Sequence, residues 1–301
     1  MNRLASARVP MTRTIAVALA TLFFSGAPAL AQAPSLPLAP APEAAPPAPA
    51  ETGALSLSAA FTDQKPIRSG LVWRVFEDKG DAGQPVQVAK SSEAEATFSL
   101  PPGAYIVHAA YGFAGASKRV TLGAGGSAER LTISAGALRL AGAVADTPIP
   151  PNRVSFSVFV PIGNNSEGRL LRDNVKAGEI IRVPEGIYHV VSTYGESNAI
   201  MRADLKVDAG RVTDATLNHR AATMTLKLVA SAGGESFAGT AFSVLTPGGD
   251  VIRELIGAFP SVTLAEGDYV VIARQGQQVY TREFHVDSGF DRDVEVLAVS
   301  K

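Results

Sequence analysis

The sequence predicts an all-β fold of three tandem antiparallel β-sandwich repeats with about seven strands each. Two observations lead to this prediction. One phrase recurs three times at a regular offset, and short runs between turn residues alternate apolar with polar side chains, which is typical of half-buried strands. The chain has 301 residues, 46% of them hydrophobic, which is enough apolar material for packed cores.

The recurring phrase places a tyrosine between two glycines. It reads PGAYIVHAAYG at 102–112, EGIYHVVSTYG at 185–195 and EGDYVVIARQG at 266–276. The first glycine allows a turn because glycine tolerates positive φ, and the tyrosine then begins a strand. We expect these tyrosines in the core, with the hydroxyl hydrogen-bonded to the backbone. They are Tyr105, Tyr188 and Tyr269.

A second set of matches gives the length of the repeat. Gly53-Ala-Leu-Ser-Leu matches Gly136-Ala-Leu-Arg-Leu, and Ala222 begins the same stretch in the third copy. One large aromatic lies twenty residues after each start, where we expect a core position: Trp73, Phe156 and Phe242. The predicted repeats are therefore 53–135, 136–220 and 221–301. Each is best closed as two facing antiparallel sheets.

The strand that begins at the tyrosine is apolar on both faces in the second and third copies. The extra apolar residues are Ile187, Val191, Val270 and Ile272. Either this strand is central in its sheet and covered, or neighbouring repeats pack on it. Few residues separate the predicted repeats, which favours a fixed arrangement of neighbours.

The N-terminus predicts export. Residues 1–31 contain three arginines, a short apolar run and a final Ala-Leu-Ala, which predicts a signal peptide cleaved near Ala31 and a periplasmic or secreted protein. An uncleaved anchor is the alternative. Residues 32–52 are rich in alanine and proline, which predicts a semi-rigid linker or a disordered leader without a role.

The net charge and the cysteine content argue against several kinds of partner and chemistry. Removing residues 1–31 takes away three arginines and no acid, so the net charge changes from −1 to −4. A mildly acidic surface argues against nucleic acid or anionic lipid as partner. The absence of cysteine excludes disulfides, thiol catalysis and a cysteine-linked lipid anchor. No membrane span is expected in the mature chain.

The phrase Gly-x-Tyr-x-Val, with a glycine seven residues after the tyrosine, resembles carboxypeptidase-regulatory-like and PEGA-type repeats, and more distantly Cna-B repeats. The resemblance implies a seven-stranded prealbumin/Ig-like sandwich that serves as a spacer or binding platform, without an activity. Cna-B relatives can carry a lysine–asparagine cross-link. The third repeat has Lys227 on its first strand but no asparagine on its last, and the second has Asn218 near its end but Arg139 instead of a lysine at its start. No such cross-link is therefore expected.

No catalytic, metal or cofactor site is predicted. His108, His189, His219 and His285 lack metal-ligand spacing and are expected to face outward. The segment DSGFDRD at 287–293 is better explained as a polar turn than as a calcium loop. There is no G-x-S-x-G motif, and no glycine-rich loop leads into a helix.

One position is a candidate ligand contact. Tyr111 and Tyr194 precede the second glycine of the phrase, whereas Gln275 stands there in the third copy. A core position rarely accepts that exchange, so we expect these tyrosines to be partly exposed at the rim. The leading interpretation is a non-catalytic exported envelope scaffold or spacer that binds another envelope protein. The alternative is a glycan-binding module for cell-wall or surface polysaccharide.

Overall fold

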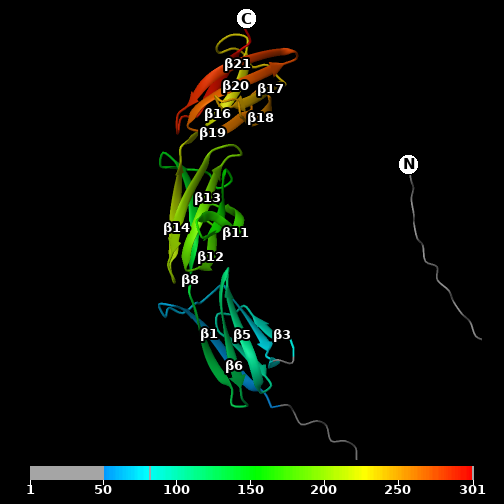
Figure 1. Cartoon of the computed structure of the whole chain (residues 1–301), viewed down its shortest axis with the longest axis vertical. Helices are drawn as coiled ribbons and strands as arrows, with labels where there is room; N and C mark the ends of the chain where they lie inside the picture. The colour runs from blue at the N-terminus through cyan, green and yellow to red at the C-terminus, as the bar shows by residue number, and fades with distance from the viewer. Residues whose placement is uncertain (1–50, 81–82, 300–301) are drawn as a thin grey trace, which may run out of the picture. The chain divides into compact units, whose positions relative to one another are not determined.

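The computed structural model describes residues 51–80 and 83–299 (Figure 1). The 22 elements of this part in chain order are all β-strands, which confirms the predicted all-β class. The predicted signal peptide and the linker up to residue 50 lie outside the described residues. The described residues contain no helical segment with the length and hydropathy of a membrane span.

The strands fall into three groups, which we call repeats 1, 2 and 3. Repeat 1 contains β1 (Gly53–Phe61), β2 (Leu71–Glu77), β3 (Val86–Ser91), β4 (Ala96–Leu100), β5 (Gly103–Tyr111), β6 (Ala114–Leu122) and β7 (Ser127–Ile133). Repeat 2 contains β8 (Ala135–Val144), β9 (Thr147–Pro148), β10 (Val154–Ile162), β11 (Asn165–Lys176), β12 (Ile180–Pro184), β13 (Gly186–Tyr194), β14 (Ile200–Val207) and β15 (Val212–His219). Repeat 3 contains β16 (Ala221–Val229), β17 (Thr240–Leu245), β18 (Val251–Gly257), β19 (Ser261–Ala265), β20 (Gly267–Gln275), β21 (Gln278–Val286) and β22 (Arg292–Leu297).

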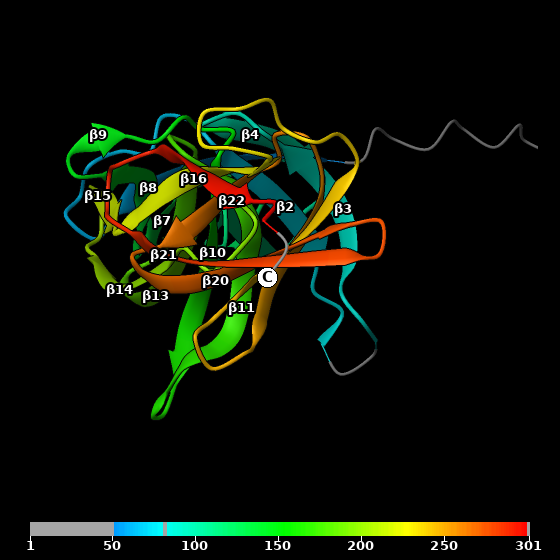
Figure 2. The same cartoon turned by 90° about the horizontal axis from the view of Figure 1, so that it is seen from above.

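Each repeat has one small and one large sheet with the same strand order. In repeat 1 the small sheet runs β4-β1-β7 and the large sheet β3-β2-β5-β6. The corresponding sheets are β12-β8-β15 with β11-β10-β13-β14, and β19-β16-β22 with β18-β17-β20-β21. The hairpin of β10 and the 12-residue β11 extends from its sheet (Figure 2).

The small sheets are mixed rather than purely antiparallel, which corrects the prediction in this respect. The first strand of each repeat pairs parallel with the last, as in β1 with β7, where Leu55 lies opposite Ser127. The same holds for β8 with β15 and β16 with β22. The reason is that alternation along a strand reports which face is buried and carries no information about the direction of its neighbour.

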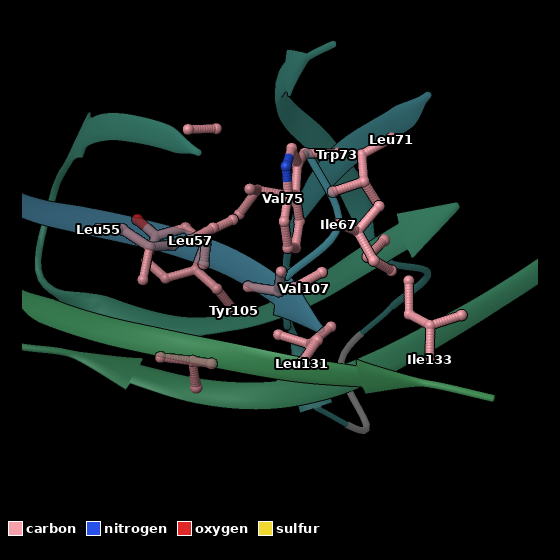
Figure 3. Packing of buried hydrophobic residues seen from close by; sticks show 14 of the residues in the cluster. Leu55, Leu57, Ile67, Leu71, Trp73, Val75, Tyr105, Val107, Leu131 and Ile133 are labelled. Atoms are coloured by element: carbon pink, nitrogen blue, oxygen red, sulfur yellow. The ribbon is translucent and has the colours of Figure 1, made fainter. Parts of the chain in front are cut away.

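Each repeat has its own core around the predicted aromatic. Trp73, Phe156 and Phe242 are 0%, 1% and 1% exposed, which confirms the prediction. Figure 3 shows the indole of Trp73 among the buried side chains Val75, Val107 and Leu131.

The repeated tyrosines are also buried, at 4–5% exposure. The hydroxyls of Tyr105, Tyr188 and Tyr269 donate to the carbonyls of Pro101, Pro184 and Ala265, in each case at 2.8 Å and four residues upstream. Because a buried hydroxyl needs a partner, this bond lets the ring fill the core at the start of the strand. The predicted role of these tyrosines is confirmed.

The strand that is apolar on both faces is central in its sheet. It is β13 between β10 and β14 in repeat 2, and β20 between β17 and β21 in repeat 3. Val191, Val270 and Ile272 are half-buried there, whereas Ile187 is 60% exposed. The hydrogen bonds between repeats join turns and strand ends instead of this face.

Candidate functional site at the junctions between repeats

Repeats 1 and 2 meet where β5 turns into β6. The amide of Phe113 donates to the carbonyl of Arg182 at 2.9 Å, and the Arg182 guanidinium lies 5.2 Å from the centroid of the Tyr111 ring. Gly70 leaves space for this guanidinium, since a Cβ there would be 2.9 Å from Cζ of Arg182. A guanidinium on an aromatic face is a favourable cation–π arrangement.

Repeats 2 and 3 meet through a second arginine. The guanidinium of Arg153 lies 5.2 Å from the centroid of the Tyr194 ring. Its Nη2 donates to Oγ1 of Thr223 at 2.9 Å and to Oγ1 of Thr263 at 3.1 Å. Arg153 therefore covers the Tyr194 ring of its own repeat and hydrogen-bonds to the next repeat.

An asparagine adds a third link at this junction. Nδ2 of Asn198 donates to the hydroxyl of Tyr269 at 2.8 Å, and its Oδ1 accepts from the amide of Ala265 at 3.1 Å. The amide group is thus used as donor and acceptor at once. Both atoms contact the turn that begins the recurring phrase of repeat 3.

The two junctions are built at equivalent positions of the repeats, but the arginine comes from the following repeat in one and from the preceding repeat in the other. Arg182 pairs with Ala137 in the ladder of β12 and β8, and Thr263 pairs with Thr223 in the same place of β19 and β16. Arg182 comes from the following repeat, whereas Arg153 comes from the preceding one. In both cases one guanidinium fills the space between the tyrosine and the next small sheet.

The third copy of the position behaves differently. Oε1 of Gln275 accepts from Oγ1 of Thr240 at 2.7 Å, and its Nε2 donates to the carbonyl of Ala238 at 3.2 Å. The side chain folds back on its own repeat. The exchange of tyrosine for glutamine therefore follows the junctions: each tyrosine lies beside a junction with the next repeat and under an arginine of that junction.

The two predicted ligand residues lie under these arginines. Tyr111 is half-buried between Arg182 and the edge of Phe61, whose ring centroid is 5.6 Å away. Tyr194 is 6% exposed, which corrects the expectation of partial exposure at this position, because Arg153 covers the ring. A ligand contact at either tyrosine stays a prediction.

The sequence reasoning missed both arginines. One signal was available: Arg153 stands three residues before the core aromatic Phe156, where the other copies have Gly70 and Gly239. A large cation in place of a glycine indicates a side chain with a specific contact. Arg182 has no comparable signal, since its strand carries no shared motif.

Histidine burial differs from the prediction. His219 is 3% exposed and His189 is 7% exposed, so two of the four histidines do not face water. His189 is held by Asp204, with Nδ1 to Oδ1 at 2.7 Å. Nε2 of His219 lies 2.7 Å from Oγ of Ser192, and the ring also hydrogen-bonds the backbone of Ala199. Burial lowers the pKa of His219.

Repeat 2 is expected to lose stability as the pH falls from about 6.5, the ordinary histidine pKa. The folded pKa of His219 is lowered, so the unfolded chain takes up the proton first and the stability present at higher pH is lost. Repeat 1 has the apolar pair Ile133 and Ala109 at the equivalent positions. The double variant His219→Ile, Ser192→Ala should therefore lack this part of the acid sensitivity.

The measurement is hydrogen-exchange protection of β13 and β15 between about pH 5 and 7.5, corrected for the intrinsic exchange rate. Strands β5 and β7 of repeat 1 serve as internal reference. An identical pH slope in the wild type and the double variant would contradict the role of His219.

His285 and two acids of the segment 287–293 each have their own partner. Asp268 raises the pKa of His285 by a hydrogen bond. In the segment 287–293, Asp291 accepts from the amide of Thr223 at 2.7 Å, and Asp293 forms an ion pair with Lys227 on the exposed side of the sheet. Across residues 51–80 and 83–299, no three histidine or carboxylate side chains come together as a metal site.

Comparison with known proteins adds one family match. Residues 223–298 match the model of the Rhizobiales growth-associated tandem repeat domain. This segment corresponds to repeat 3, and a tandem repeat domain agrees with the predicted repeat. The resemblance to carboxypeptidase-regulatory-like and PEGA-type repeats stays a prediction. No curated protein matches the chain.

Among solved structures, the chain is similar to the Bacillus anthracis TIE protein at 15% identity and a TM-score of 0.24, over 82% of this chain and 51% of that chain. The chain thus spans about half of that structure. It is similar to a streptococcal ancillary pilin at 14% identity and a TM-score of 0.31, over 83% and 100%. Two structures of BcpA, the major pilin subunit of Bacillus cereus, are similar at 12% identity and TM-scores of 0.22 and 0.23, over 82% of this chain and 99–100% of those chains.

Proposed function

We propose that the protein is a non-catalytic, exported envelope scaffold that binds another protein at the distal end of repeat 3. The observation that carries this proposal is a group of exposed apolar side chains at that end. We define the distal end by these side chains: Phe237, Ile256, Phe259, Leu297 and Val299, with exposures between 38% and 79%.

The segments that hold these side chains are joined by backbone contacts. Thr240, at the start of β17, pairs with Gly257, at the end of β18. Oγ of Ser236 donates to the carbonyl of Ala258 at 2.6 Å. Val229 pairs with Leu297 at the end of β22. The apolar side chains therefore belong to one end of the sandwich.

Repeat 2 is polar at three of these positions. Ile256 pairs with Ala241 where Lys176 pairs with Ser155 in repeat 2. Leu297 occupies the place of Asn218, and two residues later Val299 occupies the place of Arg220. Exposed apolar groups in place of charged and polar ones support a surface that another protein covers.

Export is part of the proposal and rests on the sequence. The leader at residues 1–31 supports a periplasmic or secreted location, with the linker acting as tether. Glycan binding at Tyr111 or Tyr194 is the weaker alternative, because a guanidinium lies over each ring.

The test grafts the residues of repeat 2 onto repeat 3, as Ile256→Lys, Leu297→Asn, Val299→Arg. Repeat 2 carries these residues at the equivalent positions, so the triple variant should fold. We expect crosslinking in the native envelope to capture a stable protein partner with the wild type and to lose it with the variant. Ile187→Lys, at a 60% exposed site on β13, is the matched control and should keep the partner. Equal capture by the triple variant would contradict the proposal.

A further inference from the structure

A polar cavity lies between repeats 2 and 3. Its volume is about 360 Å³, and it is bordered by the ends of β10, β11 and β13 on one side and by β18 and β19 on the other. Seven of its fifteen lining residues carry a side-chain hydroxyl or amide: Asn152, Ser155, Asn174, Thr193, Ser197, Ser261 and Thr263. Such groups can donate and accept hydrogen bonds in many orientations.

The charges around the cavity are mainly positive. Arg153, Lys176 and Arg253 line it together with one acid, Glu196. Glu196 forms an ion pair with Arg253. Arg153 donates to threonine hydroxyls, and within the described residues no carboxylate forms an ion pair with Lys176. Two cations that line one cavity without a carboxylate partner favour an anion there.

The backbone of β11 supports the arrangement. The ladder of β10 and β11 shifts register between Phe156 and Val158, and Asn174 adopts a φ of +53° there. Asparagine is among the residues that enter this left-handed region. A bulge re-aims nearby side chains and is common beside functional sites. Here Asn174 and Lys176 both line the cavity.

The lining also indicates the class of ligand. Its apolar members are the aliphatic side chains Val154, Leu255 and Val262, and no aromatic residue lines it. A nucleobase would be expected to use an aromatic stacking platform. Sugar hydroxyls match the hydroxyl and amide lining, and a carboxylate matches the guanidinium and ammonium groups. We propose that this cavity binds an acidic saccharide, with Lys176 and Arg153 holding its carboxylate.

This site depends on both repeats, since each supplies part of the lining. It is separate from the distal end of repeat 3, so the protein-binding proposal and this one can fail independently. A ligand that binds only while repeats 2 and 3 are in contact would also stabilise that contact by mass action.

The test uses isothermal titration calorimetry on the processed chain, purified from the cells that make it. The probes are tetragalacturonate, the neutral tetragalactose and inorganic phosphate. We expect tetragalacturonate to bind, with an affinity that falls as salt rises, and tetragalactose to bind about tenfold more weakly or not at all.

Two variants should move the affinity in opposite directions. Lys176→Gln should weaken tetragalacturonate binding about fivefold, because it removes a cation without an ion-pair partner. Glu196→Gln should strengthen it severalfold, because it removes the acid of the cavity. Lys206→Gln is the control: Lys206 lies on β14, outside the lining, and pairs with Asp208 at 2.9 Å.

Each contrary outcome overturns a named part of the proposal. Absence of tetragalacturonate binding at about 10 mM overturns the site. If tetragalactose binds as tightly as tetragalacturonate, the carboxylate has no role in binding. If inorganic phosphate binds as tightly as tetragalacturonate, the ligand need not be a saccharide. An affinity unchanged by Lys176→Gln overturns the location.

Discussion

The Phe156→Ala chain is expected to lose about 3–5 kcal/mol of unfolding free energy in repeat 2. The ring is 1% exposed and belongs to a cluster with Val154, Val158 and Tyr188. Truncation removes its burial and leaves a cavity that the surrounding strands fill only in part. Few single side chains of this repeat should have a larger effect.

The loss should remain within repeat 2. The buried side chains form three clusters, one for each repeat, so the cores are separate while the junctions connect them through arginine and asparagine side chains. Stability of a tandem array is then a sum of repeat and interface contributions. Because a single melting temperature is not well defined for such a chain, hydrogen exchange followed peptide by peptide is the appropriate measurement.

The matched control is Phe259→Ala. Phe259 is 59% exposed and has the Lys227 ammonium 5.6 Å from its ring centroid, so its truncation should change stability by about 1 kcal/mol or less. Phe156→Ala should reduce protection in β8–β15 and leave β1–β7 nearly unchanged. Loss of protection in all three repeats together would show that the chain unfolds as one cooperative unit.

The fold could be predicted because the same pattern of strands and turns occurs three times in the sequence. A single period-2 run is a weak signal, but Trp73, Phe156 and Phe242 recur at one offset from a shared tyrosine phrase. Each copy independently supports the same strand and the same buried face. The parallel pairing of β1 with β7 could not be predicted, because alternation is the same for either direction of the neighbour.

The candidate site was less predictable because it depends on contacts between repeats. The exchange of Tyr111 and Tyr194 for Gln275 was visible, but its cause is the cover by Arg182 and Arg153. Arg182 is brought to Tyr111 by the folding of a different repeat, and no local pattern encodes that approach. Pattern arguments describe faces of strands, whereas these contacts lie at strand ends.

His219 could have been recognised as buried. The ladders place it where repeat 1 has Ile133. An inward apolar position in one copy predicts an inward position in the others, so a histidine there needs a buried partner. Ser192 supplies it, and the spacing of histidines alone could not reveal this.

Gly112→Ala is expected to open the junction between repeats 1 and 2, while Gly276→Ala should not affect it. Both glycines have left-handed φ values, +62° and +59°. A Cβ at Gly112 would lie 2.5 Å from the carbonyl oxygen of Arg182, whereas at Gly276 no heavy atom lies within 4 Å. Alanine in this conformation costs about 1–2 kcal/mol in either place. Only Gly112→Ala adds a clash with the backbone of the next repeat.

The measurement is the exchange rate of the Phe113 amide, which donates to the carbonyl of Arg182 at 2.9 Å. We expect exchange at least about tenfold faster in Gly112→Ala and unchanged in Gly276→Ala, since a tenfold change corresponds to about 1.4 kcal/mol of opening free energy. Equal protection in the two variants would mean that the Gly112 turn is not held against repeat 2. Because the conformational cost is the same at both glycines, the difference between them isolates the contact that joins the repeats.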